Sequence, residues 1–103
     1  MTKQTTLLNA VVATGAGATE LDVNGYGGVT FHIKAASVTT GATVAMETLN
    51  ASGEWVEIDS RSITANGNTV ISATGAFTQV RANITARTDG TYTVGAIAGS
   101  PLS

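Results

Sequence analysis

Apolar and polar side chains alternate along most of this 103-residue chain. The alternation is clearest over residues 29–35, where apolar Val29, Phe31, Ile33 and Ala35 are separated by Thr30, His32 and Lys34. A period of two residues places successive side chains on opposite faces of a strand, so this pattern predicts strands with one apolar face. No stretch shows a sustained 3.6-residue period, and we expect no helix.

Turn-forming residues interrupt the alternation every 8 to 12 positions, a spacing typical of β-sandwiches and barrels. The strands are expected over residues 5–12, 19–23, 29–35, 42–49, 54–60, 69–73, 77–85 and 91–98. Asn50 to Gly53 is a candidate hairpin loop, and Thr88-Asp89-Gly90 a tight turn. The sequence therefore predicts an all-β fold, an antiparallel β-sandwich or jelly roll of about eight short strands.

The length fits a single domain covering residues 1–103. Residues 1–4 and 99–103 are expected to be flexible arms, the second of them because Pro101 cannot donate a hydrogen bond within a central strand. The apolar run from Leu7 to Ala13 is short and interrupted by Asn9, which favours an N-terminal strand over a signal peptide.

Charged residues make up only 12% of the chain, and the net charge is −2. The five basic residues are scattered, so neither a phosphate-binding stripe nor a cluster for a membrane surface is expected. The absence of cysteine excludes disulfides and thiolate chemistry. No apolar run approaches the roughly 20 residues that span a bilayer. A surface of short polar side chains suits a protein that packs against identical neighbours.

No catalytic, cofactor or metal site is legible in the sequence, and we expect no enzymatic activity. The single histidine, His32, lies on the polar face of its strand, which favours a solvated surface residue over a catalytic base. Glu57 and Asp59 share a face, with Glu47 on the neighbouring strand. Such carboxylates can bind calcium, but an ordinary solvated face is the favoured interpretation.

Three aromatic residues are candidates for interaction with a partner: Trp55, Tyr92 and Tyr26. By alternation, Trp55 shares its face with Glu57 and Asp59, where it would be able to stack on a sugar or anchor a protein. The favoured alternative is a β-bulge that turns Trp55 into the core. Both tyrosines are expected to pack their rings and keep the hydroxyl solvated or hydrogen-bonded.

Several stretches resemble small β-sandwich proteins encoded among the structural genes of tailed bacteriophages. They are residues 13–18, 21–26, 29–31, 41–47, 49–56, 80–84 and 90–94. The resemblance as a whole covers most of the chain, roughly from Ala13 to Ala98. It rests on turn-and-strand patterns. The resemblance implies a virion structural protein, most of all a capsid decoration (cement) protein that sits on the outer capsid surface and stabilises it.

The same resemblance implies the major capsid protein and copies of the chain itself as partners, in a homo-oligomer such as a trimer, with no nucleic acid, membrane or cofactor. It places the protein in the virion after synthesis in the cytoplasm of a bacterial host. The residues leave a second hypothesis open, a carbohydrate- or host-surface-binding module of a phage tail or other adhesin. An exposed Trp55 or Tyr92 would favour that alternative.

Overall fold

The computed structural model describes residues 2–17, 19–75 and 77–101, and within them every regular element is a β-strand. No helix long and apolar enough to cross a membrane occurs in these ranges. The strands are β1 (Thr2–Val11), β2 (Gly15–Ala16), β3 (Leu21–Asp22), β4 (Tyr26–Ala36), β5 (Ala42–Leu49), β6 (Trp55–Ile63), β7 (Gly67–Thr74), β8 (Gln79–Arg87) and β9 (Thr91–Pro101). The all-β prediction is confirmed.

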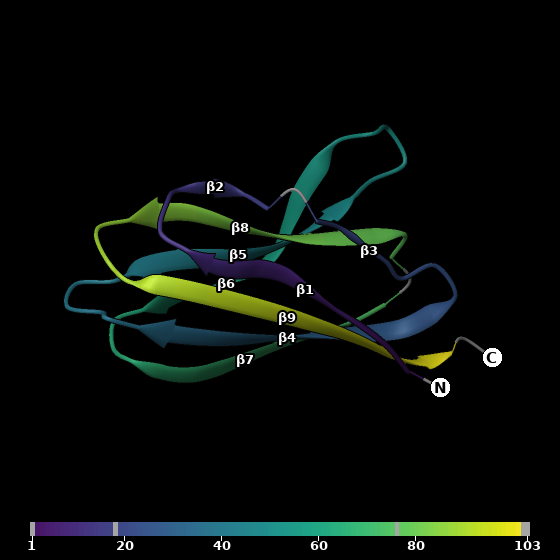
Figure 1. The fold of residues 1–103 in the computed structure, drawn as a ribbon. Coiled ribbons are helices and arrows are strands. Elements are labelled where there is room, and N and C mark those ends of the chain that lie inside the picture. The colour runs from purple at the N-terminus through teal and green to yellow at the C-terminus, as the bar shows by residue number, and fades with distance from the viewer. Residues whose placement is uncertain (1, 18, 76, 102–103) are drawn as a thin grey trace.

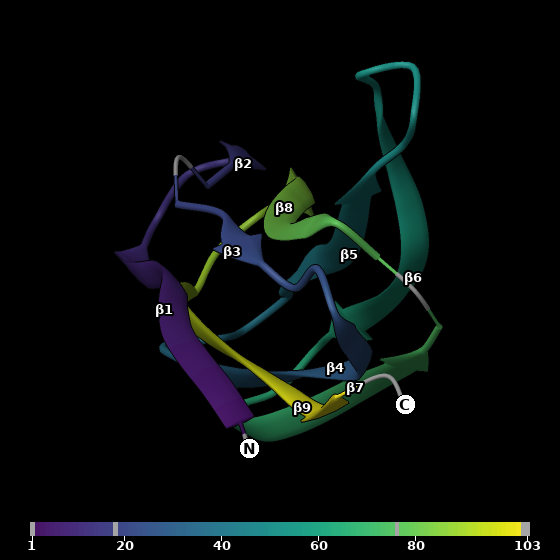
Figure 2. The same cartoon turned by 90° about the vertical axis from the view of Figure 1, so that its right-hand side faces the viewer.

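The strands form two antiparallel sheets that face each other as the layers of a sandwich (Figures 1 and 2). One sheet has the order β1-β9-β4-β7. The five-stranded sheet has the order β2-β8-β5-β6, with β3 also paired to β8. In the end-on view of Figure 2, β6 and β7 lie on one side of the sandwich and β1 and β2 on the other.

The core lies between the two sheets and is built from the apolar side of each long strand. Strand β9 shows the rule most plainly, because buried and partly exposed residues alternate along it. Its inner residues, Tyr92, Val94, Ala96 and Ala98, meet Phe31 and Ile33 of β4 and the β5 and β8 residues Val44, Met46, Val80, Ala82 and Ile84. Burying each large apolar side chain stabilises the fold by roughly 1.5–3 kcal/mol.

The two chain ends are more regular than the sequence suggested. Thr2 pairs with Gly99 and Gln4 with Ile97, so the described parts of the expected arms are the paired ends of β1 and β9. Residues 1, 102 and 103 of those arms lie outside the described ranges. Pro101 ends β9 opposite Tyr26 of β4, beyond the last β1 pair, so it blocks no hydrogen bond on the β1 side.

A β-bulge at Ile58 changes the faces of β6. Glu57 lies opposite Glu47, whereas Asp59 lies opposite the core residue Met46, and Ile58 is the extra residue between them. Directly opposed residues share a face of the sheet, so Glu57 and Asp59 belong to different faces. The expectation that these two carboxylates share one face is therefore wrong.

Candidate binding site

Trp55 directly follows the loop of the β5–β6 hairpin. The loop end of this hairpin projects away from the rest of the five-stranded sheet (Figures 1 and 2). Trp55 is the first residue of β6 and lies opposite Leu49, the last residue of β5. The loop between them is held by the side chain of Asn50, whose Oδ1 accepts the backbone N–H groups of Ser52 at 2.9 Å and Glu54 at 3.0 Å. This short, closed loop fixes where β6 begins and thereby positions Trp55.

The Trp55 side chain is half-buried but lies outside the hydrophobic core. Its register with β5 places it on the outer face of the sheet, the same face as Glu47 and Glu57. The bulge lies further along β6, at Ile58, and does not turn Trp55 inward. The favoured expectation of a core Trp55 is wrong, and the alternation across residues 55–57 was the better guide.

The guanidinium group of Arg81 stacks on the Trp55 ring, with 4.4 Å between its central carbon and the ring centroid. Arg81 belongs to β8 and lies directly opposite Glu47 of β5. Arg81 Nε donates to Glu47 Oε1 at 2.7 Å, and Asn83 Nδ2 donates to Glu47 Oε2 at 2.9 Å. The two charged side chains are 23% and 12% exposed. Both oxygens of the Glu47 carboxylate are thus engaged, and Arg81 is held in place.

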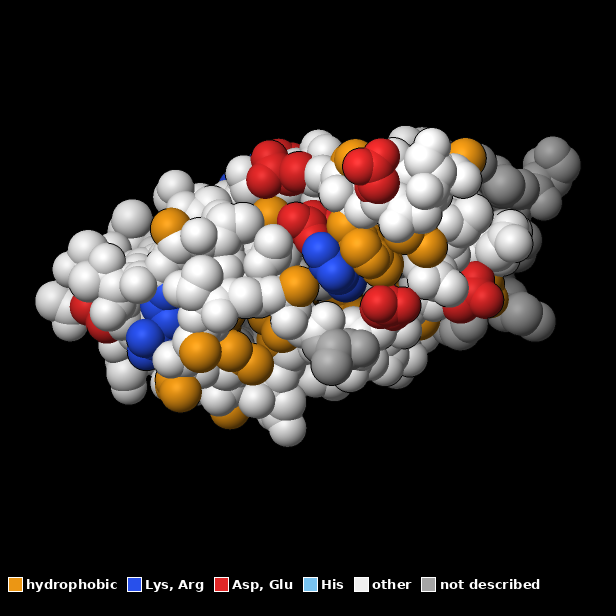
Figure 3. All heavy atoms as spheres, turned by 90° about the horizontal axis from the view of Figure 1, so that it is seen from above, with side chains coloured by type: hydrophobic (Ala, Val, Ile, Leu, Met, Phe, Trp, Pro, Cys, Tyr) orange, Lys and Arg blue, Asp and Glu red, His pale blue; other side chains and the backbone are white. Residues whose placement is uncertain are grey.

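We call Trp55, Arg81, Glu47 and Asn83 the Trp55 platform. Glu47 also faces Glu57 across β5 and β6, a like-charge pair that Arg81 compensates. Seen from above in Figure 3, the outer face of this sheet carries a basic group directly beside clustered hydrophobic side chains, with acidic groups around them. The platform combines an aromatic ring, a cation and hydrogen-bonding groups in one fixed arrangement, the chemistry of a contact surface.

Tyr92 and Tyr26 do not join this platform. Tyr92 is 0% exposed and lies in the core, where its hydroxyl donates to the backbone oxygen of Asp89 at 2.8 Å. The hydrogen bond was expected, but a buried ring cannot meet a ligand, so the candidacy of Tyr92 as an interaction residue is corrected. Tyr26 begins β4 in the other sheet, half-buried against the core.

Asp89 organises the end of the sandwich where the loops after β4 and β8 meet. Its carboxylate accepts the backbone N–H groups of Thr39 at 3.1 Å, Thr40 at 2.9 Å and Gly41 at 2.9 Å. These bonds, first that from Thr40 and then that from Thr39, lower the pKa of Asp89 below its usual value. The Asp89 carboxylate thereby joins the loop after β4 to the loop after β8.

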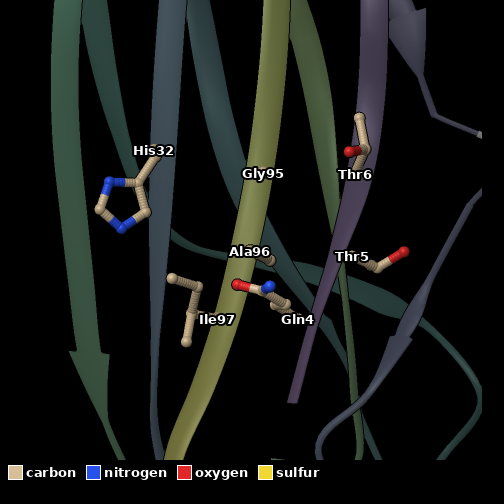
Figure 4. A pocket seen from close by; sticks show the side chains of 7 residues that line it. All are labelled: Gln4, Thr5, Thr6, His32, Gly95, Ala96 and Ile97. Carbon is tan, nitrogen blue, oxygen red and sulfur yellow. The ribbon is translucent and has the colours of Figure 1, made fainter. Parts of the chain in front are cut away.

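His32 lies on the exposed outer face of the four-stranded sheet, beside a shallow hollow over Gly95 (Figure 4). The hollow exists because Gly95 has no side chain between His32 on β4 and Thr6 on β1. Gln4 and Ile97 complete its rim. Within the described residues no group of three or more His, Cys, Asp or Glu side chains is placed to hold a metal ion.

No protein-family model matches this chain. No curated protein matches it in sequence either. Among solved structures, it is similar to the SPBc2 prophage-derived protein YomS, with a TM-score of 0.61 and 16% identity over 97% of this chain and 96% of that one. It is similar to a Bacillus endospore appendage pilus protein, with a TM-score of 0.57 and 12% identity over 100% and 88% of the two chains.

A third similar structure is a mutant of a family 29 carbohydrate-binding module, complexed with cellulohexaose. Its TM-score is 0.54, with 12% identity over 94% of this chain and 90% of that one. At these identities the likeness extends to the fold: a small β-sandwich shared with a prophage-derived protein, a pilus protein and a carbohydrate-binding module.

Proposed function

We propose that this chain is a structural component of a bacteriophage particle, and within the particle a capsid decoration protein that binds the outer capsid surface. The observation that carries the proposal is the Trp55 platform. Trp and Arg are among the residues that are most enriched in the energetic centres of protein interfaces. Here the ring and the cation are already stacked and held by Glu47, so docking requires little further ordering of side chains.

The rest of the surface supports the same proposal. Only 12% of the residues are charged, and short Thr, Ser and Ala side chains lose little conformational freedom when they are covered. A capsid presents many identical sites, so a modest contact made by linked copies adds up through avidity. The fold shared with a prophage-derived protein is consistent with an origin among phage genes.

Analysis of purified particles tests the proposal. Phage particles are induced from a host that carries the gene, purified on a density gradient and examined by mass spectrometry and cryo-electron microscopy. We expect the chain in the particles and its density on the outer capsid surface. Particles that lack the chain would overturn the structural role, and density confined to the tail would overturn the decoration role alone.

A binding experiment tests the platform itself. Particles made without the chain are mixed with purified protein and sedimented. We expect Trp55→Ala to lower the bound fraction at least about tenfold, as for a residue at the centre of an interface. Val56→Ala is the matched control, because Val56 is the next residue and is exposed. Equal binding of Trp55→Ala and wild type would overturn the assignment of the platform.

The second candidate function is carbohydrate binding. One observation favours it: the platform places an aromatic ring beside amide and guanidinium donors on a sheet face. Aromatic rings stack on the apolar faces of sugars while such donors bind hydroxyl groups. Against it, Arg81 already occupies one face of the Trp55 ring, so a sugar has to use the other face or displace Arg81.

Trp55 is the only tryptophan in the chain, so its fluorescence reports directly on the platform. Two experiments test carbohydrate binding: a fluorescence titration with cellohexaose and a glycan array. A saturable change in emission, together with array binding that is lost in Trp55→Ala, would support carbohydrate binding. Unchanged emission together with no binding on the array would exclude carbohydrate binding. The proposed role in the phage particle would not be affected by that result.

A further inference from the structure

Strand β7 (Gly67–Thr74) is the open edge of the four-stranded sheet. It pairs with β4 in an unbroken register from Gly28↔Thr74 to Ala35↔Gly67, without a bulge. Within the described part of the chain, its other side pairs with no strand. A free edge presents backbone N–H and C=O groups that are ready to pair with a further strand.

Natural proteins usually protect such edges with charges, proline, bulges or shortness. The other edges of this sandwich have these features. Strand β6 carries charged Glu57, Asp59 and Arg61 and a bulge. Strand β1 has two register shifts and a left-handed backbone at Ala10, with φ of 50°. Strands β2 and β3 have two residues each.

Strand β7 has none of these protections. Its eight residues include no charge and no proline. Val70, near its centre, is 53% exposed on the outer face, opposite His32 of β4. The backbone is held straight by β4 and by a hydrogen bond between the Thr30 and Ser72 hydroxyl groups at 3.0 Å. The strand is therefore a regular, uncharged and partly apolar edge that is kept in an extended conformation.

We propose that β7 pairs antiparallel with β7 of a second copy of this chain, which joins two four-stranded sheets into one continuous sheet. A second copy fits this edge because the strand is uncharged, so self-pairing opposes no like charges. Two-fold symmetry requires one residue to face itself. Centring the pair on Val70 buries the exposed valine against its own copy.

The remaining pairs of this arrangement are compatible. Asn68 lies opposite Ser72 of the second copy on the outer face, where an amide and a hydroxyl form hydrogen bonds. Thr69 lies opposite Ile71 of the second copy on the inner face, a pairing typical of sheets. The Trp55 platform belongs to the other sheet, so this contact is separate from the proposed docking surface.

A cysteine cross-link tests the contact. The chain contains no cysteine, so Val70→Cys introduces a single thiol. Opposed residues in an antiparallel pair have Cβ atoms roughly 4.5–5.5 Å apart, close enough for a disulfide after small shifts. We expect Val70→Cys to form a disulfide dimer under mild oxidation. The control is Val12→Cys, a similarly exposed residue just after β1, and equal cross-linking of the two variants would overturn the proposal.

Sedimentation over a concentration series provides an independent test on the unmodified chain. We expect wild type to dimerise and Val70→Lys to raise the dissociation constant at least about tenfold, because two ammonium groups then meet at the axis. Val12→Lys should dimerise like wild type, and circular dichroism checks that both variants fold. A monomer at every concentration would overturn the β7 contact. The particle-binding experiments on Trp55 do not depend on this result, because they test a different surface.

Discussion

The guanidinium group of Arg81 is shared between two partners: its carbon lies 4.4 Å from the centre of the Trp55 ring, and its Nε lies 2.7 Å from Glu47 Oε1. The ring and the carboxylate come from the two strands of one hairpin, whereas Arg81 comes from β8. Arg81 therefore ties both strands of the projecting hairpin to β8, the neighbour of β5 in the same sheet.

Arg81→Ala should destabilise the fold by about 1–3 kcal/mol, because it removes the stacked cation and leaves a mostly buried carboxylate without its charge partner. Urea denaturation followed by the fluorescence of Trp55 measures this directly. The folded variant should also show altered Trp55 emission. A free energy of unfolding within about 0.5 kcal/mol of wild type would contradict the coupling.

Glu47→Gln combined with Arg81→Ala separates the ion pair from the stacking. The double variant should lose less stability than the sum of the two single variants, because the second change removes a charge that the first left unpaired. Strict additivity would mean that Glu47 and Arg81 contribute independently, contrary to their contact.

Asp89 should give the protein part of its sensitivity to acid. Backbone N–H groups, chiefly that of Thr40, lower its pKa in the folded state. A lowered folded pKa contributes stability above the ordinary value of about 4, and that contribution is lost as the pH falls through the folded value. Asp89→Asn should therefore be less stable than wild type near neutrality, and it should lose less stability as the pH falls below about 4.

Thermal melts at stepped pH values test this expectation, with Glu54→Gln, an exposed carboxylate, as the control. Asp89→Asn should still lose some stability as the pH falls, because the pKa of Asp59 is also lowered, first by the Ser60 backbone N–H and then by Arg61. If the stability of Asp89→Asn falls with pH as steeply as that of wild type, the hydrogen bonds of the Asp89 carboxylate contribute nothing to the acid sensitivity.

Gly41→Ala should be among the most damaging small substitutions in the chain. Gly41 has φ of 115°, and a Cβ there would overlap the backbone oxygen of Ile63. Gly53 has φ of 82° with open space around it, so Gly53→Ala reports the backbone strain alone. We expect a loss of about 1 kcal/mol at Gly53 and about 3 kcal/mol or more at Gly41 by urea denaturation. Similar losses of stability at both sites would show that the overlap with the Ile63 backbone adds nothing to the cost at Gly41.

Tyr92→Phe should cost about 0.5–1.5 kcal/mol at neutral pH through loss of the hydrogen bond to Asp89. Burial, and then the Asp89 charge, raise the pKa of Tyr92. A raised folded pKa contributes stability below the ordinary value of about 10, and this is lost as the pH rises through the folded value. The variant should therefore lose less stability than wild type above about pH 10. Thermal melts in alkaline buffers test this, and an equal loss of stability in both proteins would contradict it.

The fold was largely predictable because each long strand shows its inner and outer faces within its own residues. The expected strand at residues 42–49 is β5 without change, and the Asn50–Gly53 hairpin loop was also confirmed. Strand β2 was missed because two residues, Gly15 and Ala16, are too few for a period. The start of β4 at Tyr26 was missed because Gly27 and Gly28 carry no side chains that would show an alternation.

The Trp55 platform was only half predictable. Alternation placed Trp55 and Glu57 on one face, but Arg81 and Asn83 lie 34 and 36 residues after Glu47 and meet it only through the pairing of β5 with β8. Strand pairing at that separation leaves no local signal. The bulge at Ile58 changes the face of Asp59 and depends on how two strands fit together, which no single strand encodes.

The strand order also constrains how the protein is made. Strand β9 emerges last from the ribosome among the described strands, yet it lies between β1 and β4. Until it is synthesised, β1 has no neighbour in its sheet and one side of β4 stays open. Folding therefore has to wait for the C-terminal segment and then join distant parts of the chain at once, as is typical of slow-folding β proteins. A ribosome stalled before Thr91 would hold a chain with two unmatched strands, a form prone to pair with its neighbours.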